Sequence, residues 1–175
     1  MPTKRVIEQM VYTYEELSDK AKEKVLDKHY YHNVDYDWWD AVYDDAEMVG
    51  IKIEGFDTDR GAYCKIRFMG GAEETAHKIV DEHGDMCETY KTAKAYLEAR
   101  DKLVDEWPRD EDGELEDEYG LDDKLDDLDG EFKHDISEDY RINLQKEYEY
   151  LTSREAIEES ILNGDFEFDE EGNEI

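Results

Sequence analysis

The feature that most constrains this chain is the placement of its charge along the sequence. Its 175 residues contain 52 acidic and 21 basic side chains, for a formal net charge of −31. The net charge of successive segments is 0 for residues 1–33, −7 for 34–60, −1 for 61–103, −15 for 104–139 and −8 for 140–175. Nearly neutral segments therefore alternate with strongly acidic ones. Because like charges repel one another in a compact state, the fold must keep most of these carboxylates in water.

The apolar composition is low for a folded protein. Leu, Ile, Val and Phe make 34 residues, about 19% of the chain, and such a fraction combined with high charge is typical of disorder. Thirteen tyrosines and three tryptophans indicate the opposite, because aromatic side chains bury large areas. We therefore expect a folded protein with a thin, aromatic-rich core.

Periodicity and turn residues predict an α+β fold, with a small, mainly antiparallel sheet, several packed helices and an acidic helical or loop insertion. The expected strands cover residues 5–14 and two segments within 51–71, and Phe166–Phe168 is expected to add a short strand to the sheet. The expected helices cover 15–31, 36–49, 72–83, 86–106, 137–150 and about 153–163. Thr13 with Glu16, and Thr152 with Glu155, fit capping boxes at two helix starts.

Three segments follow from this pattern. Residues 1–108 are predicted to form an α+β core, and residues 109–135 an acidic segment that is either docked or mobile. Residues 136–175 are expected to add C-terminal helices and a short strand that complete the same domain.

One predicted helix carries charge of a single sign. Between Asp35 and Glu47 the chain holds six carboxylates, two adjacent tryptophans and no basic residue. The face expected to pack on the core comprises Trp39, Val42, Tyr43, Ala46 and Val49, and a second stripe comprises Asp37, Asp40, Asp44 and Glu47. Each like-charge pair at this spacing costs about 0.2–0.5 kcal/mol. An array that costs stability without local gain favours a role outside the fold.

Two acidic patches are therefore the candidate partner-binding residues. The first comprises Asp35, Asp37, Trp38, Asp40, Asp44, Asp45 and Glu47, and the second Asp122, Asp123, Asp126 and Asp127. Closely spaced carboxylates resemble the phosphate rows that basic DNA-binding clefts recognise. Trp38, beside the stripe, is a candidate aromatic anchor. The alternative interpretation is that the acidic residues only form a solvated face, as in the acidic proteins of halophiles. Halophilic acidity should be spread evenly along the chain, whereas residues 1–33 and 61–103 are nearly neutral.

Other chemistry finds little support in the sequence. No EF-hand loop fits around Gly130, Gly113 or Gly172, although weak divalent-cation binding by residues 110–129 stays open. His29 with His32, and His83 with Cys87, have zinc-ligand spacing but no supporting motif. No nucleophile elbow, phosphate-binding glycine loop or Cys/His pairing is present, so the sequence predicts no enzyme, no cofactor and no metal site.

The expected location is the cytoplasm of a bacterial host. The N-terminus has no apolar run typical of a signal peptide, and no stretch approaches the length of a membrane span. The negative charge is expected to exclude direct binding to nucleic acid or to an anionic membrane, because both would repel it. The expected partner is a basic protein, and homodimerisation stays open.

Three segments resemble parts of small acidic proteins encoded in phage and prophage genomes, a family without an assigned function. They are YTYEELSDKAKEKVL, VDYDWWDAVYDDA and EYEYLTSREAIEESILNGDFEF. The resemblance covers both ends of the chain and leaves residues 109–135 uncovered. It implies expression inside a bacterium and transfers no functional residue. In composition and context the chain is similar to DNA-mimicking anti-restriction and anti-CRISPR inhibitors.

The predicted function is that of a phage anti-defence inhibitor, which binds the basic nucleic-acid-binding surface of a CRISPR-Cas or restriction effector by DNA mimicry. One alternative is an antitoxin-like acidic adaptor that neutralises a basic protein by specific contacts, for which Tyr36 and Trp38 would matter more than charge. A second alternative is a divalent-cation-binding acidic protein.

Overall fold

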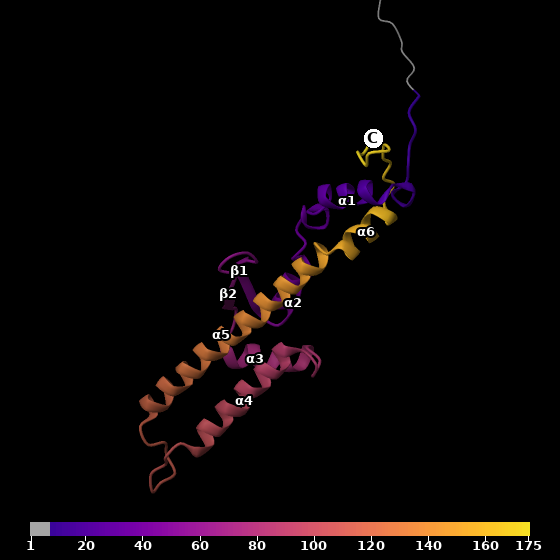
Figure 1. The fold of residues 1–175 in the computed structure, drawn as a ribbon. Helices are drawn as coiled ribbons and strands as arrows, with labels where there is room; N and C mark the ends of the chain where they lie inside the picture. The colour runs from indigo at the N-terminus through magenta and orange to yellow at the C-terminus, as the bar shows by residue number, and fades with distance from the viewer. Residues whose placement is uncertain (1–7) are drawn as a thin grey trace, which may run out of the picture. The chain divides into compact units, whose positions relative to one another are not determined.

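The structure, a computed structural model, describes residues 8–175 and confirms the predicted α+β class (Figure 1). Within these residues it contains six α-helices, two short 3-10 helices and one two-stranded antiparallel sheet. The elements are η1 Tyr14–Glu16, α1 Asp19–Lys28, η2 His32–Val34, α2 Asp40–Met48, β1 Ile51–Asp57, β2 Tyr63–Phe68, α3 Ala72–Glu82, α4 Glu88–Glu106, α5 Glu118–Leu151 and α6 Arg154–Asn163.

The chain forms two compact units. One, the terminal unit, consists of the residues up to Trp38 together with Glu147–Ile175. The other, the central unit, consists of Trp39–Lys146 and contains the sheet and residues 109–135. Helix α5 contributes residues to both units. The two candidate patches are therefore best described unit by unit.

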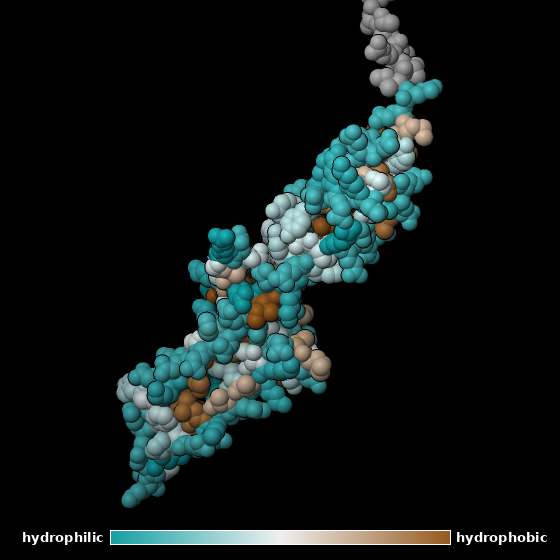
Figure 2. Space-filling model, in the orientation of Figure 1, coloured by the Kyte–Doolittle hydropathy of each residue, from teal (hydrophilic) through white to brown (hydrophobic). Residues whose placement is uncertain are grey.

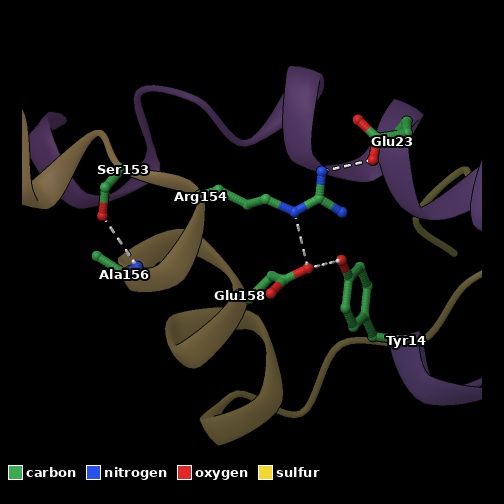
Figure 3. A network of polar contacts seen from close by, with 6 residues as sticks. All are labelled: Tyr14, Glu23, Ser153, Arg154, Ala156 and Glu158. Carbon is green, nitrogen blue, oxygen red and sulfur yellow. Dashed lines mark hydrogen bonds and ion pairs between the residues drawn. The ribbon is translucent and has the colours of Figure 1, made fainter.

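The terminal unit is built on helices α1 and α6. Its buried cluster comprises Tyr14, Leu17, Ala21, Val25, Leu26, Ile157, Ile161 and Phe168. Arg154 at the start of α6 lies between two carboxylates, with Nη1 2.5 Å from Glu23 of α1 and Nε 3.4 Å from Glu158 (Figure 3). The Tyr14 hydroxyl donates to Glu158 at 2.8 Å. Burial, and then this carboxylate, raise the pKa of Tyr14 to about 12.

Serines begin both helices of the terminal unit. Ser18 accepts a hydrogen bond from the Ala21 N–H, and Ser153 accepts one from the Ala156 N–H (Figure 3), so these residues are the N-caps of α1 and α6. The predicted capping box of Thr13 and Glu16 is present, but it opens the 3-10 turn η1 instead of α1. The second predicted box is one residue away from the true cap, because Thr152 still bonds back to the preceding helix.

The strands expected at the chain ends are reduced to isolated pairings. Residues 5–7 of the predicted first strand lie outside the described residues, and Tyr12 makes a single antiparallel bridge to Phe168. Phe168 also bridges Glu174. The prediction that Phe166–Phe168 extends the sheet is therefore wrong, because Phe168 lies in the terminal unit and the sheet in the central unit.

The sheet of the central unit has the two strands and the two faces that the sequence predicts. Strand β1 pairs with β2 in antiparallel register, with a bulge between Ile53 and Gly55. Its inner face carries Ile51, Ile53, Cys64, Ile66 and Phe68, of which the first four are buried. The alternation of apolar residues in the sequence predicted this face correctly, because successive residues of a strand point to opposite faces.

Helix α5 is longer than the sequence predicts. It runs unbroken through 34 residues, from the acidic segment to Leu151, instead of beginning near residue 137. Its buried side chains are Leu121, Phe132, Ile136, Tyr140 and Leu144, the last four at steps of four residues. Residues 118–135 therefore dock on the core as part of this helix. Among residues 8–175, no helix is long and apolar enough to cross a membrane.

Helices α4 and α5 run antiparallel and meet through long side chains (Figure 1). The Phe132 ring stacks on Tyr96 of α4 with centroids 4.3 Å apart, and it contacts Phe68 of β2 at 5.4 Å. Thr92 near the start of α4 donates to Asp139 at 2.7 Å. Phe132 thus links α5, α4 and the sheet.

Half-buried carboxylates in this unit accept hydrogen bonds from hydroxyl groups. Tyr96 donates to Asp129 at 2.5 Å, and Tyr140 donates to Asp45 at 2.9 Å. Burial is the first cause that raises the pKa of both tyrosines well above the usual range, and the carboxylates add to it. Both bonds satisfy an oxygen of a partly buried carboxylate.

Gly130 lies in the interior of α5 and is exposed. A Cβ added there would meet no atom within 4 Å. Glycine in an exposed helix interior costs about 1 kcal/mol relative to alanine. Nothing in the packing of the described residues requires glycine at this position.

Replacing Phe132 by alanine tests whether the acidic part of α5 is docked. Because this ring is 2% exposed, Phe132→Ala should lower the free energy of unfolding by about 3–5 kcal/mol. Tyr119, on the same helix and 86% exposed, is the control, and Tyr119→Ala should change it by less than about 0.5 kcal/mol. Urea unfolding of both variants provides the measurement. Equal small effects would mean that this part of α5 contributes nothing to the core.

Candidate functional site

The first candidate patch is divided between the two units. Asp35, Asp37 and Trp38 belong to the terminal unit, and Asp40, Asp44, Asp45 and Glu47 belong to helix α2 of the central unit. The predicted helix over 36–49 was wrong at its N-terminal end, because α2 begins at Asp40. Asp37 therefore lies outside the helix that was expected to carry the stripe.

Aromatic packing explains where α2 begins. Trp39 is its N-cap, and the Trp39 carbonyl accepts hydrogen bonds from the N–H groups of Val42 and Tyr43. The rings of Trp39 and Tyr43 contact Phe56 of β1 with centroids 5.5 and 6.1 Å apart. These contacts hold the first turn against the sheet. Residues 36–39 instead form a turn, in which the Trp38 N–H donates to the Tyr36 carbonyl at 2.7 Å.

Three carboxylates remain on the exposed face of α2. Asp40, Asp44 and Glu47 are exposed and are separated by steps of four and three residues, so they share one side of the helix. None of the three makes an ion pair with any residue in 8–175. They form a short acidic row with no counter-charge in the fold.

Asp45 differs from its neighbours because it faces the interior of the unit. Its Oδ2 accepts the hydrogen bond from the buried Tyr140, and its Oδ1 lies 3.3 Å from Nε2 of His83. His83 is 7% exposed, and its other ring nitrogen lies 2.7 Å from the Thr89 hydroxyl. The His83 ring, and then the Tyr140 hydroxyl, hold the pKa of Asp45 below its usual range, although burial opposes this. Asp45 thus stabilises the fold.

The aromatic anchor predicted at Trp38 is half-buried. Its ring contacts Tyr148 with centroids 5.6 Å apart, within the terminal unit. Tyr36, two residues earlier, is 61% exposed. Tyr30 and Tyr31 are also exposed, so this short stretch presents more aromatic surface through its tyrosines than through Trp38.

The second candidate patch lies on α5 and is exposed throughout. Its four members are Asp122, Asp123, Asp126 and Asp127. Two pairs four residues apart place them on one side of the helix, while Leu121 is buried. Lys124 forms the one ion pair of this patch among the described residues, at 3.2 Å from Asp127, and both partners are largely exposed. Such a pair contributes little.

The structure extends this patch into a larger surface that the sequence did not predict. Antiparallel packing places the C-terminal part of α4 beside the N-terminal part of α5, and we call residues 98–127 the acidic hairpin. It contains fifteen acidic and four basic residues, for a net charge of −11, and every one of the fifteen carboxylates is exposed. The acidic residues that α4 contributes to the hairpin are Glu98, Asp101, Asp105 and Glu106. Their helical spacing was visible in the sequence, but their partner helix was not.

Hydrogen bonds order the loop between the two helices. The Trp107 indole N–H donates to the Glu116 carbonyl at 2.6 Å. Asp110 accepts two backbone N–H groups of the turn. Asp117 has a positive φ of 50° and accepts the Gly120 N–H at 3.1 Å, which caps the start of α5. The loop therefore presents its carboxylates in a defined arrangement.

The surface of the hairpin is almost entirely polar. Figure 2 shows hydrophilic side chains over most of its visible face and hydrophobic ones along the line where α4 and α5 meet. The apolar side chains along this line include Leu103 and Leu128, with Lys102, Lys124 and carboxylates around them. A narrow seam of partly exposed apolar side chains thus lies between the charged surfaces of the two helices.

The two acidic surfaces of the central unit lie at different positions along α5. The Tyr140–Asp45 bond places α2 beside residue 140. Asp122 and Asp127 lie thirteen to eighteen residues earlier, which is about 20–27 Å along a helix. A single rigid helix therefore connects the row on α2 with the acidic hairpin.

The described carboxylates do not form a metal site. Among residues 8–175, no group of three or more His, Cys, Asp or Glu side chains converges in a way that could hold a metal ion. Comparison with protein-family models, with curated proteins and with solved structures finds no match to this chain. The functional argument therefore depends on the geometry and charge described above.

Replacing Asp44 and Asp45 by alanine, one at a time, distinguishes a carboxylate that stabilises the fold from one that is only exposed. Asp45→Ala should lower the free energy of unfolding by about 1–3 kcal/mol, because it leaves the buried Tyr140 hydroxyl without its acceptor. Asp44→Ala removes the same charge from the same helix and should leave stability unchanged or raise it. Thermal unfolding of the pair is the measurement, and equal effects would assign Asp45 to the exposed row.

The contribution of Asp45 to the free energy of unfolding should also depend on pH. Because the pKa of Asp45 is lower in the folded state, its stabilisation is fully present above the usual aspartate value of about 4. It is lost as the pH falls through the lower, folded-state pKa. The stability difference between the wild type and Asp45→Asn should therefore shrink between pH 7 and pH 3. A constant difference across this range would exclude the carboxylate charge as its source.

Proposed function

We propose that this protein is a phage-encoded inhibitor that binds a basic nucleic-acid-binding surface of a bacterial defence effector and blocks access of nucleic acid. The acidic hairpin is the observation that carries the proposal. It presents fifteen exposed carboxylates, nine on its two helices and six on the ordered loop between them.

The number of carboxylates on the two helices of the hairpin is close to the number of phosphates on a duplex of the same length. Residues 98–106 and 118–127 span about 14–15 Å each as helices, and a DNA duplex of that length carries about nine phosphate charges. These two helical segments carry nine carboxylates and three basic side chains, for a net charge of −6, and the loop between them adds a net charge of −5. A surface lined by Lys and Arg for phosphate would therefore meet a similar number of charges and gain from the same release of counterions.

The hairpin charge is not explained by stability within the fold. Asp122, Asp123 and Asp126 form no ion pair with any residue from 8 onward, and the helical pairs Asp122–Asp126 and Asp123–Asp127 repel each other. An evenly acidic, solvated surface would not need the nearly neutral segments found elsewhere in the chain. Selection for a basic partner accounts for both features.

Neutralising the α5 patch tests the proposal. Changing Asp122, Asp123, Asp126 and Asp127 to Asn should reduce capture of basic nucleic-acid-binding proteins from a bacterial lysate by at least tenfold. Stability should stay the same or rise, because two repulsive pairs are removed. The matched control changes Glu159, Asp165, Glu167 and Glu170 of the terminal unit to Gln or Asn, which alters the net charge by the same amount.

Salt and DNA distinguish mimicry from other contacts. A partner bound through the hairpin should be released by high salt and displaced by duplex DNA, and the captured proteins are identified by mass spectrometry. Equal capture by the neutralised and control variants would contradict the proposal.

An acidic adaptor that neutralises a basic toxin is the second candidate. The exposed side chains of Tyr31 and Tyr36, at 64% and 61%, favour it, because tyrosines often dominate binding energy at protein interfaces. A partner that resists high salt and is lost on Tyr31→Ala with Tyr36→Ala would support this function instead.

A further inference from the structure

The central unit contains a second charged surface, which has the opposite sign. A groove of about 560 Å³ runs between strand β2 and helix α5. The side chains and backbone that line it include Tyr63, Lys65, Arg67, Gly130, Lys133 and His134. This volume is within the range of small-molecule sites, about 300–1,000 Å³.

The charge of the groove contrasts with that of the unit around it. Residues 39–146 contain 33 acidic and 14 basic side chains, for a net charge of −19. The groove lining carries three permanent cations and a single carboxylate, Glu54. Glu54 contacts Lys65 at 3.2 Å and Nε of Arg67 at 3.3 Å. Lys133 forms no ion pair among the described residues, and the two terminal nitrogens of Arg67 form none either.

The sheet also places two cations opposite each other. Lys52 of β1 is directly opposite Arg67 of β2 in the register, and like charges placed opposite each other destabilise a sheet. Carboxylates are abundant in this chain and would relieve the repulsion at either position. The cationic face therefore indicates an anionic ligand.

The glycine of the groove supports the same conclusion independently. Gly130 is an unfavourable residue for the interior of α5, and its Cβ position is open space. It lines the groove opposite the cations of β2. Ser137, about two helical turns after Gly130, donates its hydroxyl to the Cys64 carbonyl and fixes α5 beside β2. A missing side chain at this point lets a ligand approach the helix backbone closely.

Tyr63 gives the groove an aromatic wall. The residue is 50% exposed, and its hydroxyl lies 3.8 Å from the position of a Cβ at Gly55 of β1. The ring therefore lies across the strand pair and keeps exposed surface. Exposed tyrosine rings of this kind stack on nucleobases, whereas Arg and Lys bind phosphate oxygens.

We propose that this groove binds a nucleotide, with its phosphates on Lys65, Arg67 and Lys133 and its base on Tyr63. The net negative charge of the protein opposes binding of long nucleic acids, but salt screens its distant charges over about 8–10 Å. The binding of a compact anion therefore depends mainly on the charges nearest to it in the groove. The site is separate from the acidic hairpin and does not depend on the proposed inhibitor function.

Calorimetric titration of the full chain with ADP, pyrophosphate and adenosine tests the assignment. ADP should bind at least tenfold more tightly than pyrophosphate, and adenosine should bind more weakly than both. Equal binding of ADP and pyrophosphate would overturn the role of the base. If a polyglutamate peptide bound to the protein and ADP did not, the assignment of a nucleotide as the ligand would be overturned in favour of an acidic protein partner. No binding of ADP at millimolar concentration would overturn the site.

Matched variants locate the binding. Arg67→Gln with Lys133→Gln should weaken ADP at least tenfold, whereas Lys94→Gln with Lys146→Gln, which removes the same charge from exposed positions outside the groove, should leave it unchanged. Gly130→Leu should block ADP without lowering the melting temperature. The Asp122, Asp123, Asp126 and Asp127 amide variant should bind ADP at least as well as the wild type. If the two double variants lost the same amount of affinity for ADP, the proposed location of the site would be overturned.

Discussion

Burial of the apolar face of α5 is the interaction on which the central unit depends. Phe132 lies between Tyr96 of α4 and Phe68 of β2, and Ile136, Tyr140 and Leu144 continue the same face. The opposite side of the helix carries carboxylates that repel one another. Because each like-charge pair costs only a few tenths of a kcal/mol, a few fully buried side chains are enough to offset a whole row of them. A thin core can therefore support a strongly acidic surface.

The carboxylates of the protein serve two different purposes. Asp45, Asp129 and Asp139 are partly buried and accept hydrogen bonds from Tyr140, Tyr96 and Thr92, so they connect α5 to α2 and α4. Burial raises the pKa of Asp139, whereas contacts with His83 and Tyr140 lower that of Asp45. In the hairpin, Asp110 and Asp117 accept backbone N–H groups and Asp127 pairs with Lys124, whereas most of its other exposed carboxylates form no hydrogen bond or ion pair with residues 8–175. The distinction separates residues that hold the fold together from those that are available to a partner.

Surfaces of opposite sign occupy the same unit. The acidic hairpin and the groove beside β2 both use α5, the first through Asp122–Asp127 and the second through Gly130 and Lys133. Asp127 lies six residues before Lys133, about 9 Å along the helix, so the two surfaces adjoin and the charge of the hairpin opposes binding of an anion in the groove.

Local patterns in the sequence were sufficient for much of the fold. The alternation of Ile51, Ile53, Cys64 and Ile66 determined the inner face of the sheet, and helical spacing placed α3 and α4 to within two residues of their observed ends. Charge counting identified the exposed acids of α5. These features depend on residues that are close together in the chain, so their periodicity is visible without the tertiary structure.

Contacts between distant residues decided the rest. Helical spacing placed Asp44 and not Asp45 on the acidic stripe, but only the packing of α5 against α2 brings Asp45 to Tyr140, 95 residues away. Packing of Trp39 and Tyr43 on Phe56 set the start of α2 at Asp40. The groove joins Arg67 to Lys133, which a one-dimensional charge count cannot bring together. The sequence alone determined how much charge each segment carries, and the tertiary structure decided which charges are buried, paired or gathered into a surface, because those properties depend on neighbours in space.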